Sequence, residues 1–395
     1  MVKVAVMGYG VIGSGVVEVL RTNKDIVAGH AGTGIEVTRV LDLKDLSGTP
    51  VEDIWTKDFN DILNDPEVDI VVEVMGGTGA AYKFVKASLE AGKSVVTSNK
   101  ALVAAYGPEL IAIAKEKNIN FMFEASVGGG IPIIRPLQRC ITADEILEIT
   151  GILNGTTNYI LTKMYDEGTD FDDALRQAQA KGFAEADPSA DIEGADACRK
   201  IAILASLAYG RFVDFQDIPC KGITDIDSTD IAYARLMGKK IRLFGSARND
   251  NGRIYAEVSP FFVSSSDPLF GVDGVMNAIK VRGNMLGEVM FYGAGAGSLP
   301  TASAVVSDII VEASHLHENI PTRMDAEKLS LESSLEEKDD YLIRLRNGVS
   351  LGAEYSESID GAAINEYAVI VKGISGAQLE EILAIEGVIK AIKIR

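Results

Sequence analysis

The sequence predicts an α/β protein in three parts: an N-terminal doubly wound parallel sheet, an α+β domain and a small C-terminal α/β module. Three observations predict this. Short apolar strands alternate with helical stretches up to about residue 131, longer strands and helices follow, and a charged stretch near 324–340 precedes a last strand–strand–helix–strand unit. A chain of 395 residues has the length of roughly two or three domains.

The first strand, residues 2–7, ends in a glycine-rich turn and is followed by apolar residues at helical spacing. This strand–turn–helix context gives the pattern Gly-x-Gly-x-x-Gly its meaning as a dinucleotide-binding signature. Gly8 permits the turn, Gly10 admits the pyrophosphate and Gly13 allows close helix packing. The amides of the helix N-terminus then face the phosphates. We expect a Rossmann-type domain with cofactor contacts at Gly8, Gly10, Val11, Ile12 and Gly13.

The alternation continues beyond this unit. Further strands are predicted at 35–41, 69–75, 94–97 and 120–123, with helices at 80–91 and 108–116. We assign residues 1–132 to the dinucleotide-binding domain. A glycine-rich stretch, 293–300, precedes a predicted helix at 301–312, so residues of about 293–318 are expected to complete this domain.

The second strand ends in Leu41-Asp42-Leu43-Lys44. The Asp42 carboxylate would accept hydrogen bonds from the ribose hydroxyls of NAD and repel the 2′-phosphate of NADP. Lys44 or Arg39 could instead pair with that phosphate. The sequence leans towards NAD and leaves NADP open.

A second, α+β domain is expected at 133–292. Its predicted elements are a strand at 145–153 and helices at 158–167, 172–181 and 196–209. The charged residues 324–340 are interpreted as a linker. The last unit, within 325–395, has strands at 341–346, 366–371 and 389–394 and a helix at 377–385.

Composition excludes several classes of protein. The net charge of −19 disfavours nucleic-acid binding. Three scattered cysteines lack the spacing of a zinc site or a disulfide framework, and no apolar run reaches the ~18 residues of a membrane helix. The start of the chain does not resemble a secretory signal, so we expect a cytoplasmic protein without a membrane span. Three histidines, none in a motif, disfavour a histidine base.

Two motifs fall at the carboxyl edge of the predicted parallel sheet, where such sheets bind ligands. Lys100 follows one strand and could touch the nicotinamide or transfer a proton; the alternative is a solvated lysine. The segment Glu124–Pro132 follows another. Its three glycines and its carboxylate suit a cation with oxygen ligands, and a hinge between domains is the alternative.

The densest cluster of charge lies at 182–200, where five carboxylates precede or begin an apolar helix. Asp196 and Lys200 are four residues apart and share one helix face. Facing a cleft, they would supply an anchored ammonium, with Glu185 and Asp191 offering negative charge to a cationic substrate group. A surface ion pair is the alternative.

Read in order, these stretches resemble homoserine dehydrogenase: the glycine fingerprint, Val95–Leu102, Glu124–Pro132, Asn154–Leu161, Glu185–Lys200, and Gly293–Pro300 with the residues after it. The resemblance covers nearly everything up to about residue 318. It implies the interconversion of L-homoserine and L-aspartate 4-semialdehyde with NAD or NADP, by a homodimer formed through the sheet of the second domain.

The resemblance also implies residue roles. Lys200 matches the proton donor, Lys100 a second essential lysine that contacts cofactor and substrate, and Asp196 their acidic neighbour. The expected substrate ligands are Glu185, Asp191 and Gly182, and Thr97, Lys100 and Gly297 are expected beside the cofactor. A sodium-type cation is expected at Glu124, Val127, Gly129 and Ile131, largely through backbone carbonyls. The C-terminal unit, 325–395, resembles a degenerate ACT module whose first helix and second strand are eroded.

Two other functions share features with this one. An aspartate-semialdehyde dehydrogenase needs a thiolate nucleophile, and Cys140 and Cys198 lie in helical or apolar settings rather than at a strand end. A non-catalytic NAD(P)-binding amino-acid sensor is the alternative from another class, and the presence of both lysines argues against it.

Overall fold

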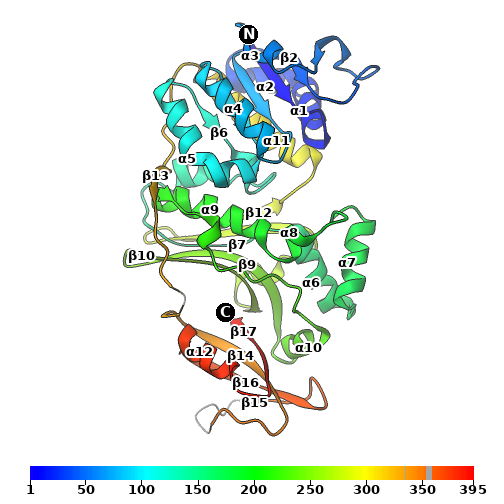
Figure 1. The fold of residues 1–395 in the computed structure, drawn as a ribbon, viewed down its shortest axis with the longest axis vertical. Coiled ribbons are helices and arrows are strands. Elements are labelled where there is room, and N and C mark those ends of the chain that lie inside the picture. The colour runs from blue at the N-terminus through cyan, green and yellow to red at the C-terminus, as the bar shows by residue number, and fades with distance from the viewer. Residues whose placement is uncertain (334, 353–357) are drawn as a thin grey trace.

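The computed structural model describes residues 1–333, 335–352 and 358–395, and its three parts follow one another along the long axis (Figure 1). The first part is a parallel six-stranded sheet of order β3-β2-β1-β4-β5-β6. Its strands are β1 (Val2–Met7), β2 (Ile35–Leu41), β3 (Trp55–Thr56), β4 (Ile70–Glu73), β5 (Ser94–Thr97) and β6 (Phe121–Met122). This is the predicted Rossmann-type sheet.

Apart from Lys3, strand β1 is apolar, because both faces of the sheet are covered. Val4 and Val6 belong to a core shared with α1 (Val11–Thr22), α2 (Lys24–Ala31) and α11 (Ser298–Ala313). Ala5 and Met7 belong to the other core, which includes α4 (Gly79–Glu90) and α5 (Lys100–Glu116). Helix α11, from late in the chain, therefore packs with the N-terminal helices.

Two predicted boundaries in this part were wrong. The helix predicted from Pro108 begins at Lys100, because the Asn99 side chain caps it by accepting from the Leu102 N–H at 3.1 Å. Pro108 lies inside the helix. The strand predicted at 120–123 is only two residues long, Phe121–Met122, and turns at once into a short 3₁₀ helix, Glu124–Ser126. The longer α5 places Lys100 in a helical first turn.

The second part is built on a mixed sheet whose order is β12-β11-β7-β9-β10-β17-β14-β16-β15. Its own strands are β7 (Ile146–Ile152), β9 (Lys239–Asp250), β10 (Arg253–Ser264), β11 (Met276–Gly283) and β12 (Gly287–Ala294). Its helices include α6 (Gly155–Glu167), α7 (Phe171–Ala180), α8 (Ser189–Ile192), α9 (Ala195–Tyr209) and α10 (Ser228–Leu236). Helix α9 packs on β7, β9 and β10 and contacts α5 of the first part. Among the described residues, we find no helix long and apolar enough to cross a membrane.

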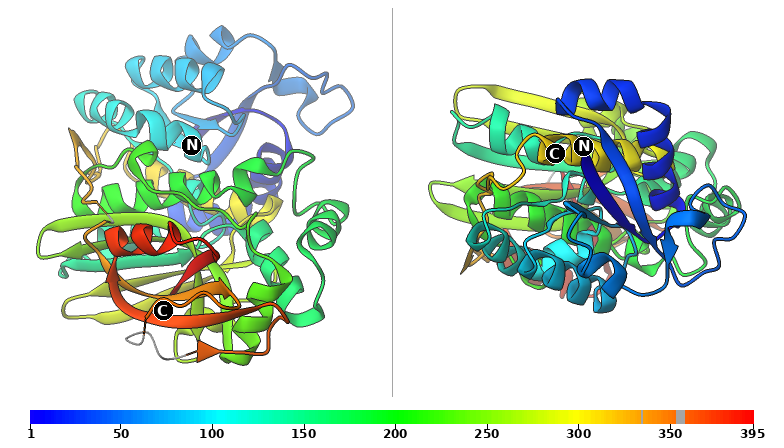
Figure 2. Two further views of the ribbon diagram at one scale, coloured as in Figure 1. Left: turned by 60° about the horizontal axis from the view of Figure 1, so that its bottom comes forward. Right: turned by 90° about the horizontal axis from the view of Figure 1, so that it is seen from above.

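The C-terminal unit extends this sheet. It comprises β14 (Lys338–Arg346), β15 (Ser358–Ile359), β16 (Glu366–Ser375), α12 (Gly376–Leu383) and β17 (Val388–Ile394). Phe262 of β10 pairs with Ile394 of β17 in parallel register, which makes the two units one continuous sheet (Figure 2). The sequence predicts that the first helix and the second strand of the ACT pattern are eroded here. Between β14 and β16 the described residues form no helix, and residues 353–357 lie outside the described residues.

The predicted linker is partly structured. Asp325–Lys328 forms β13, which pairs with β8 (Arg211–Phe212), and β14 begins at Lys338 rather than at Tyr341. The four residues of β13 are all exposed, so they carry no apolar alternation by which a strand could be recognised.

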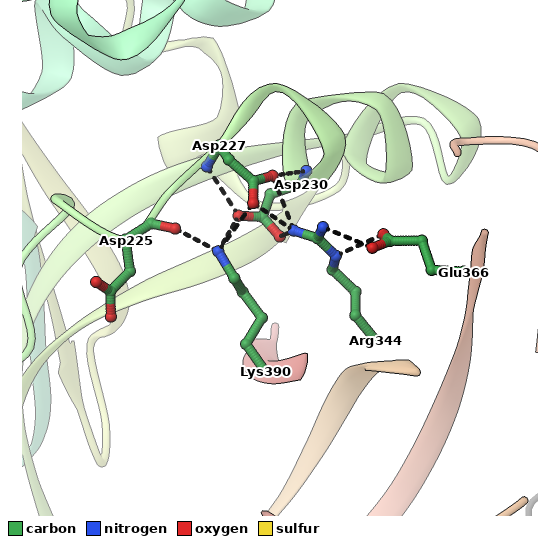
Figure 3. Close-up of polar contacts among 6 residues, drawn as sticks. All are labelled: Asp225, Asp227, Asp230, Arg344, Glu366 and Lys390. Carbon is green, nitrogen blue, oxygen red and sulfur yellow. Dashed lines mark hydrogen bonds and ion pairs between the residues drawn. The ribbon is translucent and has the colours of Figure 1, made fainter. Parts of the chain in front are cut away.

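An ion-pair cluster joins the C-terminal unit to α10 (Figure 3). Arg344 Nη1 lies 2.6 Å from Asp230 Oδ1 and 2.8 Å from Asp227 Oδ1, and Lys390 Nζ lies 2.8 Å from Asp230 Oδ2. The other edge of the guanidinium binds Glu366. Asp227 and Asp230 form the capping box of α10, and Asp230 is fully buried. The start of α10 and the contact between α10 and the C-terminal unit therefore depend on the same two carboxylates.

Replacing Arg344 by methionine should lower the free energy of unfolding by about 3–5 kcal/mol, because it removes one of the two cations that bind the buried Asp230 and the cation that binds Glu366. Urea unfolding followed by circular dichroism measures the change. The matched control is Arg253→Met, which removes an exposed pair with Asp250 and should cost less than about 1 kcal/mol. Equal effects of the two substitutions would show that the ion-pair cluster does not stabilise the contact between the C-terminal unit and α10.

Candidate active site

The glycine turn has the geometry of a phosphate-binding loop. Gly8 has φ +97°, and a Cβ built on Gly13 would lie 1.9 Å from the Gly8 carbonyl oxygen, so both positions require glycine. A Cβ on Gly10 would meet nothing within 4 Å. The space beside Gly10 is therefore open at the N-terminus of α1, where Val11 and Ile12 begin the helix. These residues fit the pyrophosphate of a dinucleotide.

Asp42 lies beside this turn despite its long spacing in sequence. Its Oδ2 accepts from the Tyr9 N–H at 2.7 Å, and its Oδ1 accepts from the Lys44 N–H at 2.9 Å. The Lys44 side chain is exposed, whereas Arg39 pairs with Asp65 at 3.1 Å. Of the two cations considered for a 2′-phosphate, Lys44 is the one without an ion pair among the described residues.

Thr97 is a positioning residue in this structure. It is fully buried, donates to Glu73 Oε2 at 2.7 Å and accepts from the Asn99 N–H at 2.9 Å. Glu73 also accepts from the N–H groups of Met75 and Gly76, and its burial raises its pKa. This buried carboxylate at the end of β4 was missed in the sequence. The sequence does carry a signal for it, namely a charged residue at the end of an apolar strand.

The two lysines meet on one carboxylate. Lys100 Nζ lies 2.9 Å from Asp196 Oδ1, and Lys200 Nζ lies 2.7 Å from Asp196 Oδ2. Lys200 also donates to the Leu153 carbonyl oxygen at 2.6 Å, and its side chain is 10% exposed. The Lys100 side chain is 41% exposed. The N-terminal halves of α5 and α9 thus hold two ammonium groups, the anchored one of Lys200 and that of Lys100, which faces solvent.

Asp196 is a charged anchor. Burial by itself would raise its pKa, but the ammonium groups of Lys200 and Lys100, with a hydrogen bond from Asn154, bring that pKa well below the usual range. The carboxylate therefore stays ionised at neutral pH and holds both lysines in place.

Asn154 is a second residue to which the sequence interpretation gave no role. Its Nδ2 donates to Asp196 Oδ2 at 2.9 Å and to Asp191 Oδ1 at 2.7 Å, and its Oδ1 caps α6 through the Thr157 N–H. It brings the predicted substrate ligand Asp191 to the lysine cluster. An asparagine directly before a helix was the visible signal, and it indicates a cap rather than this bridge.

No hydrogen bond or ion pair among the described residues joins the other two predicted substrate ligands to this cluster. Gly182 follows α7 with φ +73°, and Glu185 is exposed. Its carboxylate makes no hydrogen bond or ion pair with any described residue, while its backbone carbonyl accepts from Gln179 Nε2 at 3.1 Å. Glu185 and Gly182 remain predictions.

The predicted cation segment forms a tight backbone cradle. The Glu124 carboxylate is engaged by the N–H groups of Ile133, Ile134 and Arg135 at 2.7–2.8 Å, so its side chain shapes the segment. A Cβ on Gly129 would lie 2.3 Å from the Gly295 carbonyl oxygen. This segment therefore packs on 293–297, where Gly297 has φ +122° at the start of α11.

The carbonyl oxygens of the cradle are available as ligands. Among the turn and loop backbone hydrogen bonds of the described residues, none ends on the carbonyl of Val127, Gly129 or Ile131. Asp308 accepts from the Glu124 N–H at 2.8 Å, and burial together with the Glu124 charge raises the pKa of Asp308 to about 7. The donor set fits a hard cation bound by backbone oxygens.

Comparison with known proteins places these residues in matched regions. A model described as "Homoserine dehydrogenase, NAD binding domain" matches residues 8–124, and one described as "Homoserine dehydrogenase" matches 132–310. The homoserine dehydrogenase of Bacillus subtilis (strain 168) is 43% identical over 313 residues, which cover 78% of this chain and 72% of that protein.

Solved structures agree with this. The crystal structure of a homoserine dehydrogenase from Thiobacillus denitrificans is 35% identical with a TM-score of 0.91, over 100% of this chain and 98% of that one. A hyperthermophilic archaeal homoserine dehydrogenase in complex with NADPH is 31% identical with a TM-score of 0.68, over 82% of this chain and 99% of that one. The glycine turn and Lys100 fall in the first matched region, and Asp196 and Lys200 fall in the second. The chain therefore belongs to the homoserine dehydrogenase family.

Proposed function

We propose that this chain interconverts L-homoserine and L-aspartate 4-semialdehyde and that Lys200 transfers the proton. The observation that carries the proposal is the single buried carboxylate, Asp196, that holds Lys100 and Lys200 beside a dinucleotide-binding domain. When bound, the nicotinamide supplies or accepts the hydride. As a hydride reaches the aldehyde carbon, its oxygen gains negative charge, which a nearby ammonium stabilises and then protonates.

The substrate also carries an amino group. Asp191, which Asn154 holds next to Asp196, and the exposed Glu185 both supply negative charge in the segment that precedes α9. We propose that both, with the open backbone at Gly182, bind that group.

The direct test is turnover. The purified chain, mixed with L-aspartate 4-semialdehyde and NADH or NADPH, should consume the reduced nicotinamide and release L-homoserine. No turnover with either cofactor, combined with tight cofactor binding, would instead support the non-catalytic sensor, which the comparisons do not favour.

The cofactor preference follows from Asp42. We expect a higher kcat/KM with NADH than with NADPH, and Asp42→Asn should shift that ratio towards NADPH by roughly tenfold because it removes a charge that repels the 2′-phosphate. Steady-state kinetics with both cofactors measures the ratio, and Asp45→Asn, on the same exposed loop, is the matched control. A strong preference of the unmodified chain for NADPH would show that Lys44 decides.

The carbonyls of Val127, Gly129 and Ile131 form the proposed sodium-type site, together with the backbone of Glu124. Turnover should fall several-fold in a buffer whose only cation is tetramethylammonium, whose methyl groups keep backbone oxygens from its charge, and should return when Na⁺ is added at constant ionic strength. Equal restoration by choline would show an effect of ionic strength and no site.

Assembly and regulation are proposed more coarsely. Exposed apolar side chains gather on β12 and the turn before it, namely Met285, Leu286, Met290 and Tyr292. They support a homodimer formed through the second sheet. The strand order β17-β14-β16-β15, with α12 between β16 and β17 in the chain, supports an ACT-like origin for the C-terminal unit. Free cysteines suit a reducing compartment such as the cytoplasm.

A further inference from the structure

Two cysteines meet at the start of the helix that carries Asp196 and Lys200. Cys198 is buried in the first turns of α9, and Cys220 is exposed on the segment that precedes α10. The Cys220 Sγ lies 3.3 Å from the carbonyl oxygen of Glu193, and a Cβ built on Gly194 would lie 2.9 Å from that sulfur. Cys198 is one helical turn beyond Gly194 on the same helix face, with its Cβ tilted back towards that turn, so its thiol lies next to that of Cys220.

The two thiols differ in exposure, because Cys220 is exposed and Cys198 is buried. The contact between them lowers the pKa of Cys220, and the same contact, together with burial, raises the pKa of Cys198. Cys220 is therefore the thiol that meets reagents from solvent first. An exposed thiol beside a second, resolving thiol is the arrangement of redox-sensitive cysteine pairs.

The segment around Cys220 is held firmly. The Pro219 carbonyl accepts from the Val258 N–H at 2.9 Å, the Lys221 N–H donates to Val258 at 2.7 Å, and the Ile223 N–H donates to Ile192 at 2.8 Å. A disulfide needs its sulfurs ~2.05 Å apart, much closer than the sulfurs of a hydrogen-bonded pair. Because the Cys220 side is anchored to β10, closing the bond must pull on the first turn of α9.

We propose that Cys198 and Cys220 form an intramolecular disulfide on exposure to a low-molecular-weight disulfide, and that this bond lowers the activity of the enzyme. The Cys220 thiolate attacks one sulfur of the reagent and releases its first thiolate. The Cys198 sulfur then attacks the mixed disulfide, and the second reagent thiol leaves with the Cys198 proton. Two protein thiols are oxidised by two electrons, and one disulfide is reduced to two thiols.

The switch acts through Asp196, and this part rests on the proposed function. Asp196 lies between Gly194 and Cys198 in the turn that the disulfide would displace, and it holds both lysines. A displacement of about 1 Å at a catalytic group can cost ~10²-fold in rate. Oxidation should therefore lower kcat by at least roughly tenfold.

The test uses the full chain and oxidised glutathione. After incubation, non-reducing peptide mass analysis should find a Cys198–Cys220 peptide pair lighter by two hydrogens than its reduced parts, and activity should fall in parallel and return with dithiothreitol. Cys140→Ser, which removes the third cysteine, should behave like the unmodified chain. Cys220→Ser, at an exposed position, and Cys198→Ala should each keep their activity in the oxidant.

Three results would overturn the proposal: glutathione retained on Cys220 with no cross-link, a cross-link that leaves kcat unchanged, or equal inactivation of the Cys220→Ser variant. Mass analysis reads the cross-link without turnover. If the reduced chain is inactive, the proposed function fails, while the cross-link itself is still decided by the masses.

Discussion

Replacing Lys200 by alanine should lower kcat by about 10²–10⁴-fold while the protein remains folded, because the substitution removes the ammonium that protonates the developing alkoxide. Lys200 suits this role through its position. Its Nζ is held by Asp196 at 2.7 Å and by the Leu153 carbonyl at 2.6 Å, so little reorganisation is needed when charge develops. Steady-state kinetics gives kcat, and circular dichroism verifies folding.

Comparison with Lys100→Ala separates the two lysines. Lys100 is exposed and has Asp196 as its only ion-pair partner among the described residues, so its loss should also reduce kcat by orders of magnitude and raise KM through lost substrate and cofactor contact. Added methylammonium should partly restore kcat in the Lys200 variant, since it supplies a proton at the emptied position. The control is Lys117→Ala, at the exposed far end of α5, which should leave kcat unchanged.

Near-normal turnover of Lys200→Ala would remove Lys200 from the mechanism. If methylammonium restored kcat only in the Lys100→Ala variant, the proton transfer would be assigned to Lys100. Either result would leave the fold and the family intact, because these rest on the whole matched length and on the sheet topology.

The parts of the molecule that the sequence predicted well are local. The glycine turn is encoded within six residues, and the strand and helix around it follow from apolar spacing alone. Asp196 and Lys200 could be paired because four residues of separation place them on one helix face. The joint order of the motifs then indicated the family, which the comparisons confirm.

The parts that it did not predict depend on contacts between distant segments. Asn154 looks like an ordinary helix cap, and only the packing of α6 near α9 brings its amide to Asp191 and Asp196. Glu124 looks like a cation ligand, but the turn that follows brings three N–H groups to its carboxylate. The pairing of β17 with β10 joins strands far apart in the chain, and no local pattern encodes that register.

Asp196→Asn should be the most informative single substitution, because it keeps the shape of the side chain and removes its charge. The two ammonium groups would lose their common anion and repel each other, so kcat should fall by at least ~10²-fold, and the free energy of unfolding should fall by about 3 kcal/mol at neutral pH. Glu193→Gln, an exposed neighbour in the same segment, should change neither quantity.

The stability difference should also depend on pH with a defined sign. The pKa of Asp196 is lowered in the folded state, so its ionisation stabilises the protein fully above the unfolded-state pKa of about 3.9, and this contribution is lost as pH falls below that value. Urea unfolding of both proteins should therefore give a constant difference from pH 7 to about pH 5 and a smaller one towards pH 3.5. A difference that grew on acidification would mean that burial dominates and that Asp196 is not the anion that anchors the two lysines.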